Sequence, residues 1–266
     1  MTLERRQALV RCARDFDALI ISDDVYDQLQ WPADRSSNFT PLDKAYLPRL
    51  VDIDSELDGG ALRAGADGFG NAMSNGSFSK IIGPGLRVGW AEGTPKFAYG
   101  VSQCGTSCSG GAPSQLTSTY VTKLLESGFV RKHILETVQP AYARRYRVMM
   151  EALEAYMLPL GCSLVQSDRT NVGGYFIWLA LPLRIDAEQL AEQCKVQENV
   201  VVAPGTLFEV PGDATVAFPN FIRLCLSWED EPLLVEGVRR IADVLSKMMK
   251  GSESQPEPKH DTGAFW

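Results

Sequence analysis

The sequence predicts an α/β chain in which a larger domain with a mainly parallel sheet precedes a smaller α+β domain. Near the start, a helical pattern is followed directly by the unbroken apolar run 18–21, which is typical of a strand covered by helices on both faces. Beyond Gly161, strand-like runs are interleaved with helices. We therefore expect the larger domain over residues 1–156, the smaller one over 157–250, and a disordered polar tail over 251–266.

The larger domain is expected to begin with a helix and a short strand. Apolar residues recur at helical spacing between positions 9 and 16, and the helix ends at Asp17, just before the apolar run. Parallel sheets bind their ligands beyond the carboxyl ends of the strands. The polar cluster 22–26 falls at that end of the first strand, so it is a candidate for a ligand site.

Further along, residues 31–73 have the composition of a loop, with one apolar stretch at 47–57 that predicts an ordered segment. A second strand is expected at 88–91, and a long helical region from Pro113 to Leu135. The next helix carries an apolar stripe from Tyr142 to Tyr156, which indicates core packing.

The smaller domain is expected to contain strands at 174–181, 200–203 and 221–227 and to end in a long amphipathic helix. Pro232 suits the first turn of that helix. One apolar stripe runs along it, formed by Leu234, Val238, Ile241, Leu245 and Met248.

The composition excludes several classes of partner. The net charge is −7 at pH 7, and no cluster of Lys and Arg provides a surface for nucleic acid. There is no apolar run of about 18 residues and no signal-peptide pattern at the start, so we expect a cytoplasmic protein without a membrane partner. The six scattered cysteines are expected to be reduced, and with only two histidines we expect no metal site.

Lys80 is the leading candidate for chemistry. It follows Ser79 and precedes an apolar, glycine-containing stretch at 81–86 rather than a run of charges. A lysine amine that attacks an aldehyde must be partly neutral, which burial or a cationic neighbour such as Arg87 favours. Taken alone, the same placement also fits a lysine exposed on a loop.

The string around this lysine is specific. SFSKIIGPGLRVG, residues 77–89, resembles the lysine motif of the class I/II aminotransferases, which use pyridoxal 5′-phosphate (PLP) and have fold type I. The resemblance implies that Lys80 forms the Schiff base with PLP and that Ser77 and Arg87 hold its phosphate. An arginine suits that role because its planar fork matches phosphate oxygens and stays charged.

Two further segments resemble the same family. Asp23 and Tyr26 match its Asp-x-x-Tyr element at a strand end, which implies a carboxylate facing the pyridine nitrogen and a phenol at the 3-oxygen of PLP. Arg223 matches its arginine that binds the substrate α-carboxylate, and the segments 173–178 and 203–208 match in order. Alternation places Ile222, Leu224 and Leu226 on one strand face and Arg223 on the other.

The resemblance runs from about Thr2 to Lys250 and corresponds to the later part of such an enzyme. Upstream elements of the family, including part of the phosphate cradle and the ring that stacks on PLP, have no match. We therefore expect an incomplete PLP-transferase large domain followed by the small domain. Family members dimerise, so we expect a homodimer if the chain is complete, or a chain that needs a complementing N-terminal half.

The resemblance implies a PLP-dependent aminotransferase, an enzyme of amino acid metabolism or biosynthesis that exchanges an amino group between an amino acid and a 2-oxo acid. Two alternatives stay open, namely a PLP-dependent carbon-sulfur lyase that performs β-elimination on the same scaffold and a non-catalytic aminotransferase-like fragment. The glycines at 83, 85 and 89 superficially resemble a dinucleotide-binding loop, but their spacing is wrong for that motif.

Overall fold

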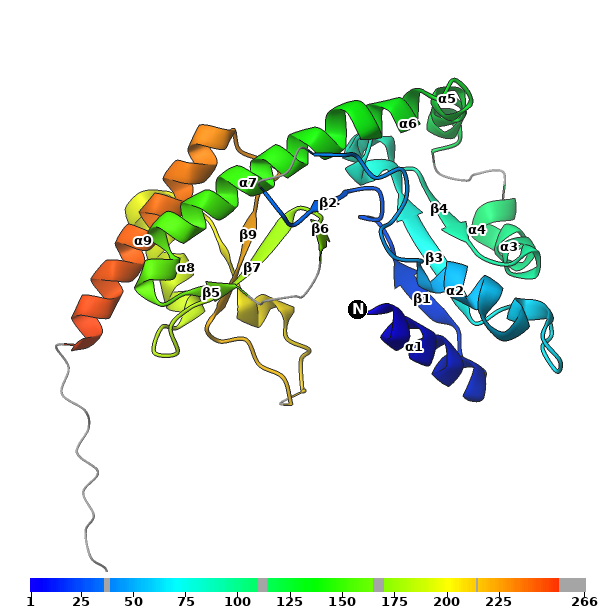
Figure 1. The fold of residues 1–266 in the computed structure, drawn as a ribbon, viewed down its shortest axis with the longest axis horizontal. Helices are drawn as coiled ribbons and strands as arrows, with labels where there is room; N and C mark the ends of the chain where they lie inside the picture. The colour runs from blue at the N-terminus through cyan, green and yellow to red at the C-terminus, as the bar shows by residue number, and fades with distance from the viewer. Residues whose placement is uncertain (36–38, 110–113, 165–169, 214, 254–266) are drawn as a thin grey trace, which may run out of the picture. The chain divides into compact units, whose positions relative to one another are not determined.

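The structure is a computed structural model, and it describes residues 1–35, 39–109, 114–164, 170–213 and 215–253 (Figure 1). The chain divides into two compact units. Unit 1 comprises Met1–Ala143 and Arg169–Gly174, and unit 2 comprises Arg144–Asp168 and Tyr175–Trp266. The dividing point lies within helix α7 (Gln139–Tyr156), whereas the sequence placed it after that helix.

Unit 1 combines short strands with helices. Its strands are β1 (Ile20–Asp23), β2 (Gln30–Pro32), β3 (Ala72–Ser77), β4 (Gly89–Glu92) and β6 (Asn171–Gly173). Its helices are α1 (Leu3–Asp15), α2 (Leu50–Glu56), α3 (Pro95–Ser102), α4 (Gly105–Cys108), α5 (Gln115–Glu126) and α6 (Phe129–His133), followed by a π-helical turn (Ile134–Val138) and the start of α7. The expected start of the helical region at Pro113 lies outside the described residues.

The main sheet of unit 1 has the strand order β1-β3-β4, as Figure 1 shows. Strands β1 and β3 pair in parallel, whereas β3 and β4 pair antiparallel. The described sheet is therefore mixed, not mainly parallel as expected. The physical reason is the short connection from β3 to β4, since a parallel return requires a crossover of about a dozen residues or more, usually a helix.

Strand β1 is exposed on one face, which corrects the expectation of a strand covered on both. Ile20 packs against a cluster that contains Val10 of α1 and Leu50 and Ile53 of α2. The side chain of Ile21, by contrast, is 71% exposed. Because successive strand residues point to opposite faces, helices that pack on the Ile20 side leave Ile21 uncovered.

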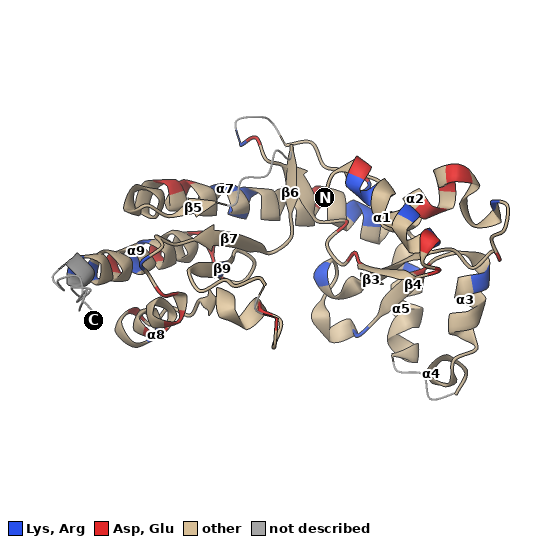
Figure 2. Ribbon diagram, turned by 90° about the horizontal axis from the view of Figure 1, so that it is seen from below, with Lys and Arg blue, Asp and Glu red and all other residues tan. Residues whose placement is uncertain are grey.

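A buried ion pair joins the two helices to the start of β3. Arg14 of α1 donates to the carboxylate of Asp54 of α2 at 2.9 Å, and these side chains are only 8% and 3% exposed. The same carboxylate accepts the backbone N–H groups of Asn71 and Ala72 at 2.6 and 3.1 Å. Figure 2 shows mainly basic residues on α1 and acidic residues on α2. This network positions the strand that leads to Lys80.

Unit 2 contains a four-stranded antiparallel sheet with the order β5-β7-β9-β8. Its strands are β5 (Ser163–Leu164), β7 (Phe176–Ala180), β8 (Ala203–Pro204) and β9 (Phe221–Cys225), and its helices are the larger part of α7, α8 (Ala187–Glu198) and α9 (Glu231–Glu253). Helices α8 and α9 pack together. The predicted stripe of α9 is confirmed from Leu234 to Leu245, where its residues are at most 5% exposed.

The predicted tail 251–266 lies beyond the described residues except for the last turn of α9. Among the helices that the structure describes, none has the length and apolar character needed to cross a membrane. The described residues also contain no group of three or more His, Cys, Asp or Glu side chains arranged to hold a metal ion.

Candidate active site

The parallel pairing of β1 and β3 places the carboxyl ends of the two strands together. Asp23 lies opposite Asn75 in the register, and the Asn75 side-chain amide donates to the Asp23 carboxylate at 3.0 Å. The backbone N–H of Asp24 donates to the carbonyl of Asn75 and continues the pairing past the strand. Ser77 follows two residues later on β3, so Asp23 and Ser77 both lie at the carboxyl ends of these strands, where parallel sheets bind ligands.

Lys80 lies on a tight turn at the end of β3. The Ser77 hydroxyl accepts the backbone N–H of Ser79 at 3.1 Å, which starts a 3-10 turn over Phe78–Lys80. The side chains of Phe78 and Ile81 are 8% and 5% exposed and anchor the turn on both sides of the lysine. Lys80 itself is only partly buried.

Tyr26 lies beside Lys80, although 54 residues separate them in the chain. The Nζ atom of Lys80 is 5.9 Å from the centroid of the Tyr26 ring. The turn that carries Tyr26 is closed by the N–H of Leu29, which donates to the Tyr26 carbonyl at 2.9 Å. Gly174 has a φ of +79° and lies against the ring, since a Cβ atom added there would be 3.5 Å from it.

Arg87 and two serine hydroxyls form a cationic, hydrogen-bonding group next to Lys80. Arg87 has a left-handed backbone with a φ of +53°, which is uncommon for a residue other than glycine. Its Nη1 atom donates to the Pro84 carbonyl at 3.0 Å and to the Ser79 hydroxyl at 3.5 Å. With Ser77 on the same turn, these groups are suited to bind an anion.

A cluster of carboxylates borders the Tyr26 turn. Burial, with a smaller contribution from Asp24, raises the pKa of Asp27 to about 7, although Arg49 lies only 3.7 Å away. Arg49 also pairs with Asp52 of α2 at 2.7 Å and with Glu92 of β4 at 2.6 Å. This arginine therefore ties the turn to two neighbouring elements.

Arg223 belongs to unit 2, whereas the other five predicted residues belong to unit 1. The predicted alternation is confirmed, because Ile222 and Leu224 are 0% and 4% exposed while Arg223 points to the other face of β9. Its guanidinium lies 3.9 Å from the centroid of the Phe176 ring and 4.3 Å from that of Phe208. The guanidinium of Arg223 therefore lies against two aromatic rings.

Three groups were not anticipated from the sequence. Asn75 contacts Asp23, Ser79 contacts Arg87, and the ring of Phe208 stacks on Arg223. A signal existed for Asn75, since it lies two residues before Ser77 on β3 and therefore shares its face. The other two contacts depend on turn geometry that no periodicity reveals.

Comparison with solved structures defines the class of protein to which this fold belongs. The chain superposes on the multiple substrate aminotransferase of Thermococcus profundus with a TM-score of 0.72 and 28% identity, covering 94% of this chain and 53% of that one. It therefore has the fold of the PLP-dependent aminotransferases of fold type I.

The family follows from comparisons of sequence. Residues 1–241 match the family model for aminotransferase class I and II, and the chain belongs to this family. It is 37% identical to an uncharacterized protein of Saccharomyces cerevisiae over 85% of this chain and 48% of that protein. It is also 28% identical to the 2-aminoadipate transaminase of Thermus thermophilus over 93% of this chain and 54% of that enzyme. The chain thus spans about half the length of these curated relatives.

Proposed function

We propose that this chain carries the lysine, phosphate and carboxylate sites of a PLP-dependent aminotransferase, which exchanges an amino group between an amino acid and a 2-oxo acid. The observation that carries this proposal is the convergence of Lys80 and Tyr26 at the carboxyl end of a parallel strand pair, where the Nζ atom of Lys80 is 5.9 Å from the centroid of the Tyr26 ring. Family membership over residues 1–241 supports it independently.

The donor chemistry of the site fits PLP. Arg87, Ser77 and Ser79 offer one cation and two hydroxyls for a phosphate, and the Asp23 carboxylate can accept the N–H of a protonated pyridine. The Tyr26 phenol can donate to the 3-oxygen. When bound, PLP supplies an electron sink for negative charge developed at the substrate α-carbon.

Each protein group then has a role that its position supports. Lys80 would hold the cofactor through its aldehyde group, and the free amine of Lys80 would move a proton to and from the substrate α-carbon as a general base. Asn75 holds the Asp23 carboxylate in place. Arg223 binds the substrate α-carboxylate through paired N–H donors.

The proposal extends to the architecture. Unit 1 would represent part of the PLP-binding large domain, expected over residues 1–156, and unit 2 the smaller C-terminal α+β domain. The proposed assembly is a homodimer, as the family resemblance implies. Light scattering of the purified chain measures its mass directly.

The decisive experiment traps the cofactor on its lysine. The chain is incubated with PLP, reduced with borohydride, digested, and analysed by mass spectrometry for the pyridoxyl group. We expect the label on the peptide that contains Lys80, its loss in Lys80→Ala, and its retention in the control Lys123→Ala, whose side chain is 74% exposed. Equal labelling of the Lys80→Ala chain would overturn the assignment.

Product analysis separates the possible activities. An aminotransferase needs a 2-oxo acid acceptor to turn over, whereas release of pyruvate and ammonia from a cysteine-type substrate without an acceptor would identify a lyase. Calorimetric titration with PLP tests the non-catalytic fragment, because tight 1:1 binding to a cooperatively unfolding chain contradicts an inert one.

A further inference from the structure

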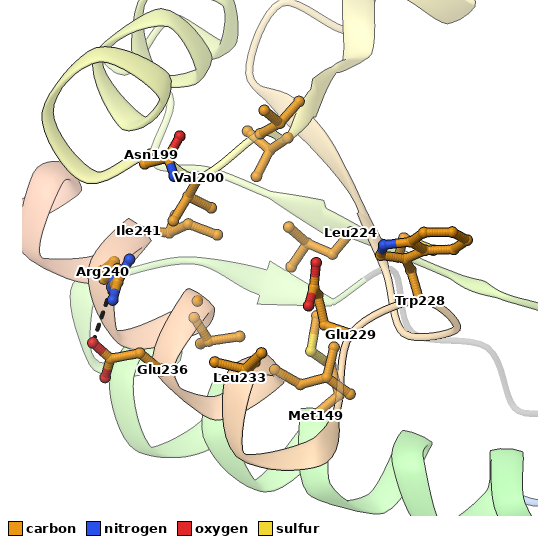
Figure 3. Close-up of a pocket in the computed structure, with 16 residues that line it drawn as sticks. Met149, Asn199, Val200, Leu224, Trp228, Glu229, Leu233, Glu236, Arg240 and Ile241 are labelled. Atoms are coloured by element: carbon orange, nitrogen blue, oxygen red, sulfur yellow. Dashed lines mark hydrogen bonds and ion pairs between the residues drawn. The ribbon is translucent and has the colours of Figure 1, made fainter.

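Unit 2 contains a cavity of about 570 Å³ that none of the proposed catalytic residues lines (Figure 3). It lies between the first half of α9, the segment 199–202 and the turn that follows β9. Its apolar lining includes Met149, Leu224, Leu233 and Ile241. The volume is within the usual range of small-molecule sites, which is about 300–1,000 Å³.

Large apolar side chains are exposed at the edge of this cavity. Trp228 is 86% exposed, Val201 83% and Leu233 53%, and all three line the cavity. Contiguous exposed apolar groups that surround a cavity mark binding sites more often than scattered ones do. A ligand with an apolar body would remove them from water.

Of two carboxylates that line the cavity, one is paired with arginines and the other is not. Glu236 accepts hydrogen bonds from Arg239 and Arg240, which lower its pKa to about 2, so this acid is ionised and paired. The carboxylate of Glu229, by contrast, forms no ion pair among the residues that the structure describes. Figure 3 shows Glu229 on the Trp228 side of the cavity and the Glu236–Arg240 pair on the opposite side.

The turn that presents Trp228 and Glu229 is held from behind. Arg145 of α7 donates to the backbone carbonyl of Leu226 at 2.7 Å and to that of Glu229. Because the arginine is engaged with main-chain oxygens, the Glu229 side chain is left for another partner. Such fixed positioning lowers the entropy that a ligand must overcome.

We propose that this cavity binds a small organic cation, with its apolar body against Leu224 and Leu233 and its charged nitrogen between the Trp228 indole and the Glu229 carboxylate. An indole face attracts cations, and a neighbouring carboxylate adds an ion pair. An anionic ligand would meet the unpaired carboxylate, and a neutral one would leave it unmatched. The site is separate from the proposed PLP site and does not depend on it.

The test uses benzyltrimethylammonium, a quaternary cation that cannot react with an aldehyde and so cannot report on the Lys80 site. Binding to the full chain is measured by calorimetry and by the indole N–H signals in NMR spectra. The neutral comparison is 2-methyl-1-phenyl-2-propanol, which has nearly the same shape. We expect the cation to bind about fivefold to tenfold more tightly than the alcohol, with Trp228 giving the largest shift.

Variants locate the site. Glu229→Gln and Trp228→Ala are each expected to weaken cation binding by about fivefold or more, whereas Glu151→Gln on the exposed face of α7 leaves it unchanged. Thermal melts establish that each variant is folded. The conservative variant Trp228→Phe keeps an aromatic ring at this position and should bind the cation more tightly than Trp228→Ala does. Equal affinity for cation and alcohol, an unaffected Glu229→Gln chain, or no binding at millimolar concentration would each overturn the proposal.

Discussion

Replacing Asp54 by alanine removes the acceptor on which the start of strand β3 depends. This carboxylate is 3% exposed and accepts the backbone N–H groups of Asn71 and Ala72 as well as the guanidinium of Arg14. Removing one partner of a buried ion pair costs about 3–5 kcal/mol, because the other charge stays buried without its counterion.

The structure places the expected loss near the lower end of that range. Arg14 also donates to the carbonyls of Leu57 at 2.9 Å and of Asp54 at 3.0 Å, and both acceptors survive the substitution. We therefore expect Asp54→Ala to lower the free energy of unfolding by about 3 kcal/mol. Asp54→Asn keeps one oxygen acceptor and should cost about 1–2 kcal/mol.

Urea unfolding followed by circular dichroism measures these losses. The control is Asp43→Ala, which removes a pair with Arg131 whose side chains are 59% and 69% exposed, so it should lower stability far less than Asp54→Ala does. A double-mutant cycle with Arg14→Met isolates the pair itself. A loss below about 1 kcal/mol for Asp54→Ala would refute the buried-pair reasoning.

Three further predictions concern a titration, a hydrogen bond and the thiols. Because the pKa of Asp27 is raised to about 7, the folded chain keeps a proton that the unfolded chain releases above about pH 4, so stability falls as the pH rises through this window. Asp27→Asn should make the free energy of unfolding less dependent on pH by about 1–2 kcal/mol, a figure already reduced for the partial exposure of Asp27. A wild-type chain with the same urea midpoint at pH 5 and pH 8 would contradict this. Asn75→Leu removes the hydrogen-bond donor to the Asp23 carboxylate. We expect it to weaken PLP binding, measured by calorimetry, about threefold to tenfold while the stability of the chain changes little. An unaltered affinity for PLP would exclude a positioning role for Asn75. Burial raises the pKa of the Cys162 and Cys194 thiols to about 11. A thiol reagent should therefore modify the four exposed cysteines of the native chain rapidly and these two only after unfolding. Rapid modification of all six cysteines in the native chain would contradict the fold.

Local sequence patterns predicted those structural features that depend on residues close together in the chain. The helical period predicted α9 and its buried stripe, and alternation predicted the burial of Ile222 and Leu224. The same reasoning predicted the helix α1, whose buried residues are Val10 and Ala13, whereas Leu9 is 37% exposed and Phe16 lies just beyond the helix. Periodicity locates a helix, but the face that is buried depends on what packs against it.

The sequence by itself determined the family, the α/β character, and the motif around Lys80, because these are encoded in contiguous residues such as 77–89. Only the tertiary structure decided that Tyr26 lies beside Lys80, that Asn75 holds Asp23, and that the sheet is mixed. The physical reason is that strand pairing joins segments about 50 residues apart, and its register depends on the packing of both faces rather than on either segment alone.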